Sequence, residues 1–213
     1  MSLAERIADL FFVPKCIICS AVIERPGICI KCQGELAEAV KPVRGVEFLE
    51  EVRAAYIYEG ALRDAVHRFK FGGKKSYAAV MGDRMLPLLE RLEARPQVIS
   101  WVPTSAERLR KRGYDQAQVL AEYIAGRAGL PCRRLLTRRR SGKQSNLGNK
   151  AARVANAAGA FRTAEDVSGL SILLVDDVVT TGATLSECAR VLLTEGASEV
   201  RACAFACVKG IVK

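Results

Sequence analysis

One stretch of the sequence decides the fold: Ile172-Leu173-Leu174-Val175-Asp176-Asp177-Val178-Val179-Thr180-Thr181-Gly182-Ala183-Thr184. Its apolar beginning, residues 172–175, predicts a buried parallel strand that ends in two carboxylates. A short polar loop follows, and then a helix whose apolar residues repeat at helical spacing and which stops at Gly196. A strand, a loop and a helix in this order place a ligand at the carboxyl edge of an open α/β sheet.

The loop offers the donors that a phosphate monoester needs. Successive backbone N–H groups of residues 181–184 can converge on one point, and the positive end of the helix dipole faces the same point. Gly182 allows the backbone to approach closely. The phosphate-binding candidates therefore combine backbone and hydroxyl donors, and they are Thr180, Thr181, Gly182, Ala183 and Thr184.

The two acids before the loop need a different partner. Asp176 and Asp177 would repel a phosphate, so we expect them to bind vicinal hydroxyls, either directly or through Mg²⁺. A phosphate beside a diol is a ribose 5-phosphate. The alternative is an ordinary turn with a helix-capping threonine, but a cap does not explain paired acids on a buried strand.

The eight cysteines divide into a cluster of four and a scattered four. Cys16-x-x-Cys19 and Cys29-x-x-Cys32 have the spacing of two knuckles, and four thiolates in a tetrahedron suit Zn²⁺, with iron as the alternative. So small a module buries little, and the metal is expected to supply its folding energy. The module is then either a docking finger for a partner or DNA, or a metal staple. The scattered thiols are expected to be small core residues, and they are Cys132, Cys188, Cys203 and Cys207.

Composition bounds the class of protein. The chain has 213 residues and a net charge of +10, which favours anionic partners such as polyphosphates or nucleic acid. No run of eighteen apolar residues occurs, so no membrane-spanning helix is expected. The start of the chain has acids and no cleavable small-residue pattern, and we expect a cytoplasmic protein. We expect two parts: residues 1–45 with an N-terminal helix and the four-cysteine module, and residues 46–213 as an α/β domain.

A second strand end is predicted after residues 98–102. Basic residues crowd the turns that follow it, before a helix that begins at Asp115 as its N-cap. One strand end carries acids and hydroxyls, and the other carries basic residues. Together the two loops could hold both ends of ribose 5-phosphate 1-pyrophosphate (PRPP). Trp101, next to this edge, is expected in the core, and the lysines at positions 70, 74 and 75 on a solvated face. Residues 141–150 are polar and predict a mobile loop or lid, with a plain basic loop as the alternative.

The stretch at residues 172–184 resembles the PRPP signature of the type I phosphoribosyltransferases. The resemblance implies an open, mostly parallel sheet with helices on both faces and a flexible lid loop. It implies that the acids bind the ribose hydroxyls, that the loop binds the 5′-phosphate, and that Mg²⁺ accompanies PRPP. The loop after the other strand would bind pyrophosphate through Thr104, Ser105, Arg108 and Arg112. The lid would contribute Lys143 and Arg153, and the residues expected to be catalytic are Asp176, Asp177, Lys143 and Arg112.

The wider combination is similar to the ComF family, over almost the full length. It consists of the tetracysteine module, His67-Arg68-Phe69-Lys70-Phe71, Arg112-Gly113-Tyr114-Asp115-Gln116-Ala117, Lys143-Gln144-Ser145-Asn146-Leu147, residues 156–161 and the PRPP loop. Asp115 stands where this family leads us to expect Asn, which puts a base or ribose contact there in doubt. The resemblance implies a link to DNA uptake in natural transformation.

Two functions compete at this point. One is a Mg²⁺-dependent phosphoribosyltransferase that passes the 5-phosphoribosyl group to an unidentified acceptor, usually a nitrogen, with release of pyrophosphate. The other is a non-catalytic PRPP or nucleotide binder that assists DNA uptake through single-stranded DNA or partner proteins. A DNA-binding protein that needs no nucleotide is a third reading. Thr180 stands where some purine-salvage members carry an acid, and a hydroxyl cannot replace that base near pH 7, so 6-oxopurine salvage is disfavoured.

Overall fold

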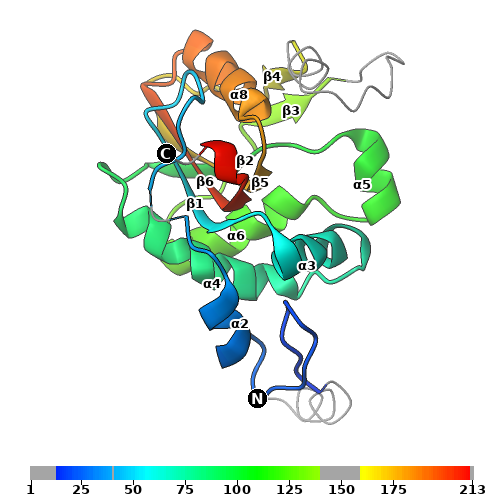
Figure 1. Ribbon diagram of the computed structural model, residues 1–213. Coiled ribbons are helices and arrows are strands. Elements are labelled where there is room, and N and C mark those ends of the chain that lie inside the picture. Colours follow the sequence, from blue (N-terminus) through cyan, green and yellow to red (C-terminus); the bar gives the residue numbers. More distant parts are fainter. Residues whose placement is uncertain (1–12, 40, 140–158, 212–213) are drawn as a thin grey trace.

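The computed structural model describes residues 13–39, 41–139 and 159–211 (Figure 1). Within these residues the main sheet has four parallel strands in the order β1-β6-β5-β2. These strands are β1 (Glu51–Ile57), β2 (Val98–Trp101), β5 (Ser171–Val179) and β6 (Glu199–Cys207). A separate antiparallel pair joins β3 (Leu136–Arg138) to β4 (Phe161–Thr163). The described helices are α2 (Ile30–Glu35), α3 (Gly60–Phe71), α4 (Tyr77–Glu90), α5 (Ala106–Arg112), α6 (Gln116–Ala128), α8 (Ala183–Thr194) and the 3₁₀ turn η1 (Lys209–Ile211).

Helices cover both faces of the main sheet, as predicted (Figure 1). Side chains alternate along a strand, so Leu173 and Val175 of β5 enter the core under α3, α4 and α6. Ile172 and Leu174 face the opposite way, into the core that α8 shares with β3 and β4. A strand that is buried on both faces needs apolar residues at every position, which explains the uninterrupted apolar run.

Strand β5 is longer than the sequence predicts. We expected it to end at Val175, but it continues to Val179, and Asp176 lies opposite Ala204 of β6. On its other side, β5 loses its neighbour at residue 175, where the N–H of Val102 donates to the carbonyl of Val175 at 3.1 Å. The next residue of that chain is Pro103, which has no N–H to continue the ladder. Strands β2 and β5 therefore separate at Asp176 and Asp177, whereas β5 and β6 stay paired. We call this point the split in the sheet.

Local signals predicted the start of α6 and the burial of several residues. Asp115 is the N-cap of α6, and its side chain accepts from the N–H of Ala117 at 3.2 Å. Ser76 occupies the N-cap position of α4, but its side chain makes no capping bond. Trp101 is buried, as expected. Of the scattered thiols, Cys188, Cys203 and Cys207 are buried and Cys132 is half-buried.

The described helices include none that is both long and apolar enough to cross a membrane. The division of the chain at residue 45 stays a prediction. The expected N-terminal helix and the lid residues, Lys143 and Arg153 among them, lie outside the described residues.

Candidate functional site

The four clustered cysteines form a compact thiol centre, as their spacing predicted. Their sulfur atoms all lie within 4.8 Å of one another, and the sulfurs of Cys19 and Cys29 are 3.8 Å apart. Zinc–sulfur bonds of about 2.3 Å in a tetrahedron place the sulfurs about 3.8 Å apart, so the centre has the dimensions of a zinc tetrathiolate. The N–H of Cys29 donates to the sulfur of Cys16 at 3.3 Å, and α2 begins directly after Cys29.

The protonation of these thiols is uneven. Burial raises the pKa of Cys16, but the backbone N–H groups of Cys19, Cys29 and Ile18 outweigh it and lower that pKa to about 7. Burial and the neighbouring thiols raise the pKa of Cys32 well above its usual range. A cluster of this kind ionises fully only around a cation, because four thiolates repel one another.

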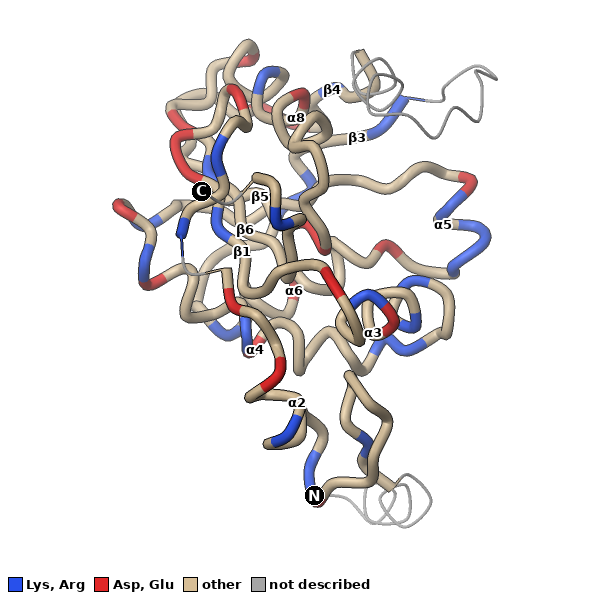
Figure 2. The backbone as a smooth tube through the Cα atoms, viewed as in Figure 1, with Lys and Arg blue, Asp and Glu red and all other residues tan. Residues whose placement is uncertain are grey.

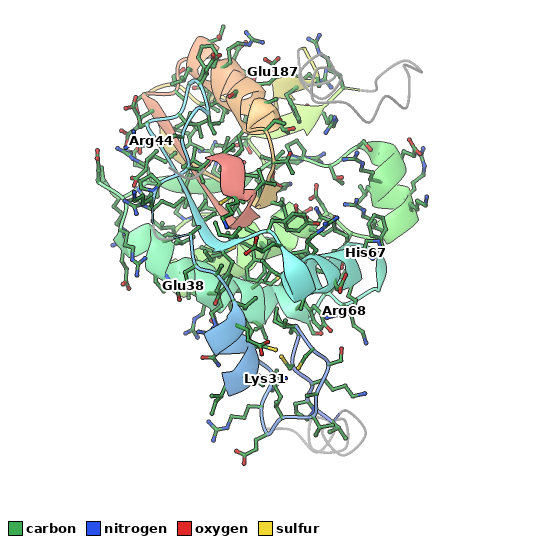
Figure 3. The ribbon with its side chains drawn as sticks, in the orientation of Figure 1. Lys31, Glu38, Arg44, His67, Arg68 and Glu187 are labelled. Carbon is green, nitrogen blue, oxygen red and sulfur yellow. The ribbon has the colours of Figure 1, made fainter. Side chains whose placement is uncertain are left out.

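Arg68 of α3 links the knuckle at residues 16–19 to the α/β domain by hydrogen bonds. Its Nη2 donates to the carbonyl of Ile17 at 2.7 Å and to the carbonyl of Ile18 at 2.6 Å. These carbonyls belong to the residues between Cys16 and Cys19. Figure 3 labels Arg68 on the side of α3 that faces the thiol sulfurs.

The two acids of β5 have different surroundings. Asp177 is 7% exposed, and its Oδ1 lies 2.9 Å from the Nζ of Lys70 on α3. Asp176 is half-buried, and its Oδ1 accepts from the N–H of Asp177 at 2.8 Å. The expectation that Lys70 belongs to a solvated face is therefore wrong, because α3 continues to Phe71 and brings Lys70 against Asp177.

Charge coupling governs the titration of this group. Burial and the charge of Asp177 raise the pKa of Asp176 far above the usual range of a carboxyl group. Burial lowers the pKa of Lys70, but Asp177 and Asp176 outweigh that effect and raise it. Lys70 therefore carries its full charge at neutral pH and compensates one of the two acids.

The N-terminus of α8 is open. Gly182 occupies the N-cap position with φ +76° and has no side chain that could cap the helix. A Cβ on Gly182 would lie 2.7 Å from Cγ2 of Val46, so the space beside this glycine is taken by the protein itself. The hydroxyl of Thr181 accepts from the N–H of Ala183 at 3.4 Å. Thr180, Ala183 and Thr184 are half-buried around the same turn.

The loop after β2 is organised by Asp115. The N–H of Thr104 donates to Asp115 Oδ2 at 2.8 Å, which ties this loop to the start of α6. Ser105 is the N-cap of α5 and accepts from the N–H of Arg108 at 3.3 Å. Figure 2 shows α5 projecting from the body with basic residues along it, and its last turn holds Arg110, Lys111 and Arg112.

Arg112 joins two of the sequence motifs. Its Nη1 donates to Gln116 Oε1 at 2.7 Å, and its guanidinium carbon lies 4.6 Å from the ring centre of Phe71. Burial lowers its pKa, and the charge of Asp177 acts in the opposite direction. The hydroxyl of Tyr114 donates to the carbonyl of Phe69. Residues 67–71 and 112–117 thus pack against each other beside the acids.

Sequence reasoning missed Arg138. This residue lies on β3, with its guanidinium carbon 5.1 Å from the ring centre of Phe161. Burial and the charge of Arg108 lower its pKa, and the charge of Asp176 acts against that. The sequence has five arginines between residues 133 and 140, and nothing in their spacing alone singled out Arg138. In a strand, Arg138 and the buried Leu136 lie on the same face because they are two residues apart.

Comparison with known proteins defines the class. Residues 110–210 match the model of the phosphoribosyl transferase domain. These residues include β5, the loop and the open end of α8, so the chain carries a domain of the phosphoribosyltransferase type with the parallel sheet expected of it.

Three relatives narrow the class to a family. The DNA utilization protein YhgH of Salmonella typhimurium is 31% identical over 199 residues, 87% of each chain. YhgH of Escherichia coli O6:H1 is 34% identical over 68% of this chain and 66% of that protein. The competence protein ComFC of Bacillus subtilis is 30% identical over 72% of this chain and 62% of that protein. The matches thus span just under two thirds of the Escherichia coli and Bacillus proteins. The chain belongs to the ComF family of phosphoribosyltransferase-like proteins.

Proposed function

We propose that the chain binds PRPP with Mg²⁺ at the split in the sheet and transfers its phosphoribosyl group to an acceptor. The ribose hydroxyls donate to Asp176 and Asp177, and the 5′-phosphate binds at the N-terminus of α8. We also propose that zinc is the metal of the four thiols, because the measured sulfur spacing fits its bond lengths.

The observation that carries this proposal is the placement of opposite chemistries at one edge. Two carboxylates lie at the end of the β2–β5 pairing, and the next residues of the same chain lead into the N-terminus of α8, whose N-cap residue is a glycine. A carboxylate pair binds hydroxyls and a cation, whereas the helix end binds an anion. A sugar phosphate is a ligand that presents both.

Two arginines of the chain, Arg112 and Arg138, would stabilise the negative charge of the leaving pyrophosphate. Arg112 of α5 lies against Phe71, the residue after Lys70, and the charge of Asp177 influences its pKa. The charge of Asp176 influences the pKa of Arg138 on β3 in the same way. Bound Mg²⁺ would add charge neutralisation at the pyrophosphate. The protein's part in such a transfer is to position the ribose and to stabilise charge that develops as the bond to carbon 1 breaks.

The test is a thermal-stability scan with PRPP and Mg²⁺, against Mg²⁺ alone and against ribose 5-phosphate. A ligand at a hundred times its dissociation constant adds about 2.7 kcal/mol, which such a scan detects. Asp177→Ala should lose the PRPP shift, while Asp64→Ala, an exposed aspartate of α3, should keep it. A PRPP shift of normal size in folded Asp177→Ala would refute the site.

A second candidate function is binding without turnover, in support of DNA uptake. It is favoured by Thr180, which offers a hydroxyl where a catalytic acid would take a proton. The names of the relatives, DNA utilization and competence proteins, fit this role as well. Pyrophosphate release in the presence of PRPP, Mg²⁺ and a panel of nucleobases and amines distinguishes the two: turnover supports transfer, and PRPP binding with no release in any mixture supports the second candidate.

A further inference from the structure

Lys70 is the feature that the proposed function leaves unexplained. Its ammonium group lies 2.9 Å from Asp177, the acid that is expected to bind the ribose. Both side chains are largely buried, with 22% of the Lys70 side chain and 10% of the Asp177 side chain exposed. An ion pair this close in a buried place is held firmly, because neither charge is well hydrated.

The ion pair engages a carboxylate oxygen of Asp177 that a divalent cation would also need. Mg²⁺ binds carboxylate oxygens at about 2.0–2.1 Å, and a second cation on the same buried carboxylate is strongly repelled. In the described part of the chain, Asp177 is the acceptor that the structure gives to Lys70.

We propose that Lys70 is a built-in counter-ion that keeps divalent cations off Asp177 until PRPP brings Mg²⁺ with its own phosphate oxygens. This role rests on the proposed function, since it concerns the same site. When PRPP binds, its phosphate oxygens supply the negative charge that lets Lys70 and Mg²⁺ coexist. Lys70 is then a positioning residue: it acts on the ligand through the carboxylate that it holds.

The proposal predicts that removal of Lys70 raises the affinity of the protein for a free divalent cation. A lysine with a purely structural role would, when removed, weaken every binding event at the site. Lys70→Gln should instead create a site for a free divalent cation, because it removes the cation that is paired with Asp177. The gain should be at least about tenfold in affinity, which corresponds to about 1.4 kcal/mol.

The experiment measures Mn²⁺ binding to the full chain by electron paramagnetic resonance of free Mn²⁺. The thiol centre is first saturated with zinc, so that it cannot take up the probe. Wild type should bind Mn²⁺ weakly, Lys70→Gln at least about tenfold more tightly, and Lys74→Gln, an exposed lysine just beyond the helix, like wild type. The double variant Lys70→Gln/Asp177→Asn should lose the gain.

Each contrary outcome overturns the proposal. Equal or weaker Mn²⁺ binding by folded Lys70→Gln contradicts it, and so does a gain that survives in the double variant. If Lys70→Gln does not fold, the test uses wild type and Asp177→Asn. Tight Mn²⁺ binding by wild type in the absence of PRPP, lost in Asp177→Asn, would refute the proposal that Lys70 keeps free cations off Asp177.

PRPP binding is scored separately by thermal shift. A missing PRPP shift together with the expected Mn²⁺ pattern would overturn the proposed function and leave the role of the ion pair at Asp177 standing. A normal PRPP shift with unchanged Mn²⁺ affinities would overturn the role of Lys70 and leave the function standing.

Discussion

The thiol centre and the acidic edge of the sheet are assembled in opposite ways. In the thiol centre, all four thiols come from residues 16 to 32, and two of them flank the start of one short helix. At the acidic edge, Lys70, Arg138 and Asp177 come from three elements far apart in the chain. A site made within one short segment can be read from spacing, whereas a site made between distant elements exists only once the sheet is formed.

The two regions are nevertheless joined by α3. Arg68 reaches from this helix to the carbonyls of the knuckle, and Lys70 reaches to Asp177. Two residues along a helix are about 200° apart around its axis, so the two side chains leave it in nearly opposite directions. The following experiments ask how independent the two regions are, beginning with the one expected to have the largest effect.

Replacement of one thiol should abolish the metal centre. In Cys16→Ser the metal content should fall from one equivalent to near zero, with loss of a contribution to folding of the module on the order of 10 kcal/mol. Elemental analysis measures this and also identifies zinc or iron. Cys132→Ser, outside the cluster, should keep its metal; full metal content in Cys16→Ser would exclude a tetrathiolate site.

Loss of Arg68 should loosen the knuckle but leave the ligands intact. Arg68→Ala removes two charge-assisted hydrogen bonds to Ile17 and Ile18, which together contribute about 2 kcal/mol. Zinc transfer to a coloured chelator should be faster by roughly 30-fold, if release requires the knuckle to open. Arg63→Ala, which removes a guanidinium 5.9 Å from the ring centre of Tyr58, should not change the rate. An unchanged rate in Arg68→Ala would mean that the knuckle holds its metal without help from α3.

The titration of Asp176 should appear in the pH dependence of stability. Its folded-state pKa is raised by burial and by Asp177, so the stability linked to the neutral acid is fully present at low pH and is lost as pH rises through the folded pKa, about 8. Asp176→Asn mimics the neutral acid at every pH. The variant should match wild type near pH 3, below the ordinary carboxyl pKa of about 3.9, and melt about 3 °C or more above it at pH 9, roughly 1 kcal/mol at this chain length. Parallel melting curves at all pH values would contradict the raised pKa.

Asp115 should give the smallest effect. Its carboxylate accepts from Thr104 and from Ala117, and Asn also caps helices well but has one acceptor oxygen. Asp115→Asn should therefore cost about 0.5–1 kcal/mol in urea unfolding. Because the negative charge near the β2 loop disappears, PRPP affinity should rise modestly in calorimetry. A fall in affinity would show that the charge itself orders this loop for the ligand.

The sequence predicted the parts whose signals are local. The alternation-free run at 172–175, the N-cap at Asp115 and the four cysteines all report on their own neighbourhoods, and the structure has each of them. It did not predict that Lys70 pairs with Asp177. A lysine next to two apolar residues on a helix has no feature that distinguishes a solvated charge from one buried against a distant acid.

The same reasoning explains two further errors. The end of β5 was predicted at the acids because carboxylates are costly in a core, but β6 continues beside them and Lys70 compensates one charge. Arg138 was missed among five arginines because residues 136–138 form a strand only by pairing with residues 161–163, and the spacing from Leu136 indicates a face only once that strand is known.

Trp101 gives the molecule an optical property of practical use. It is the chain's single tryptophan, it is buried, and it pairs in register with Val175, the residue before the two acids. Its indole emission therefore originates at the split in the sheet, while the knuckle contributes no indole. A shift in emission on adding a ligand would report occupancy of this edge in the unlabelled protein and in real time. Stopped-flow fluorescence could then measure the order in which a sugar phosphate and a cation bind.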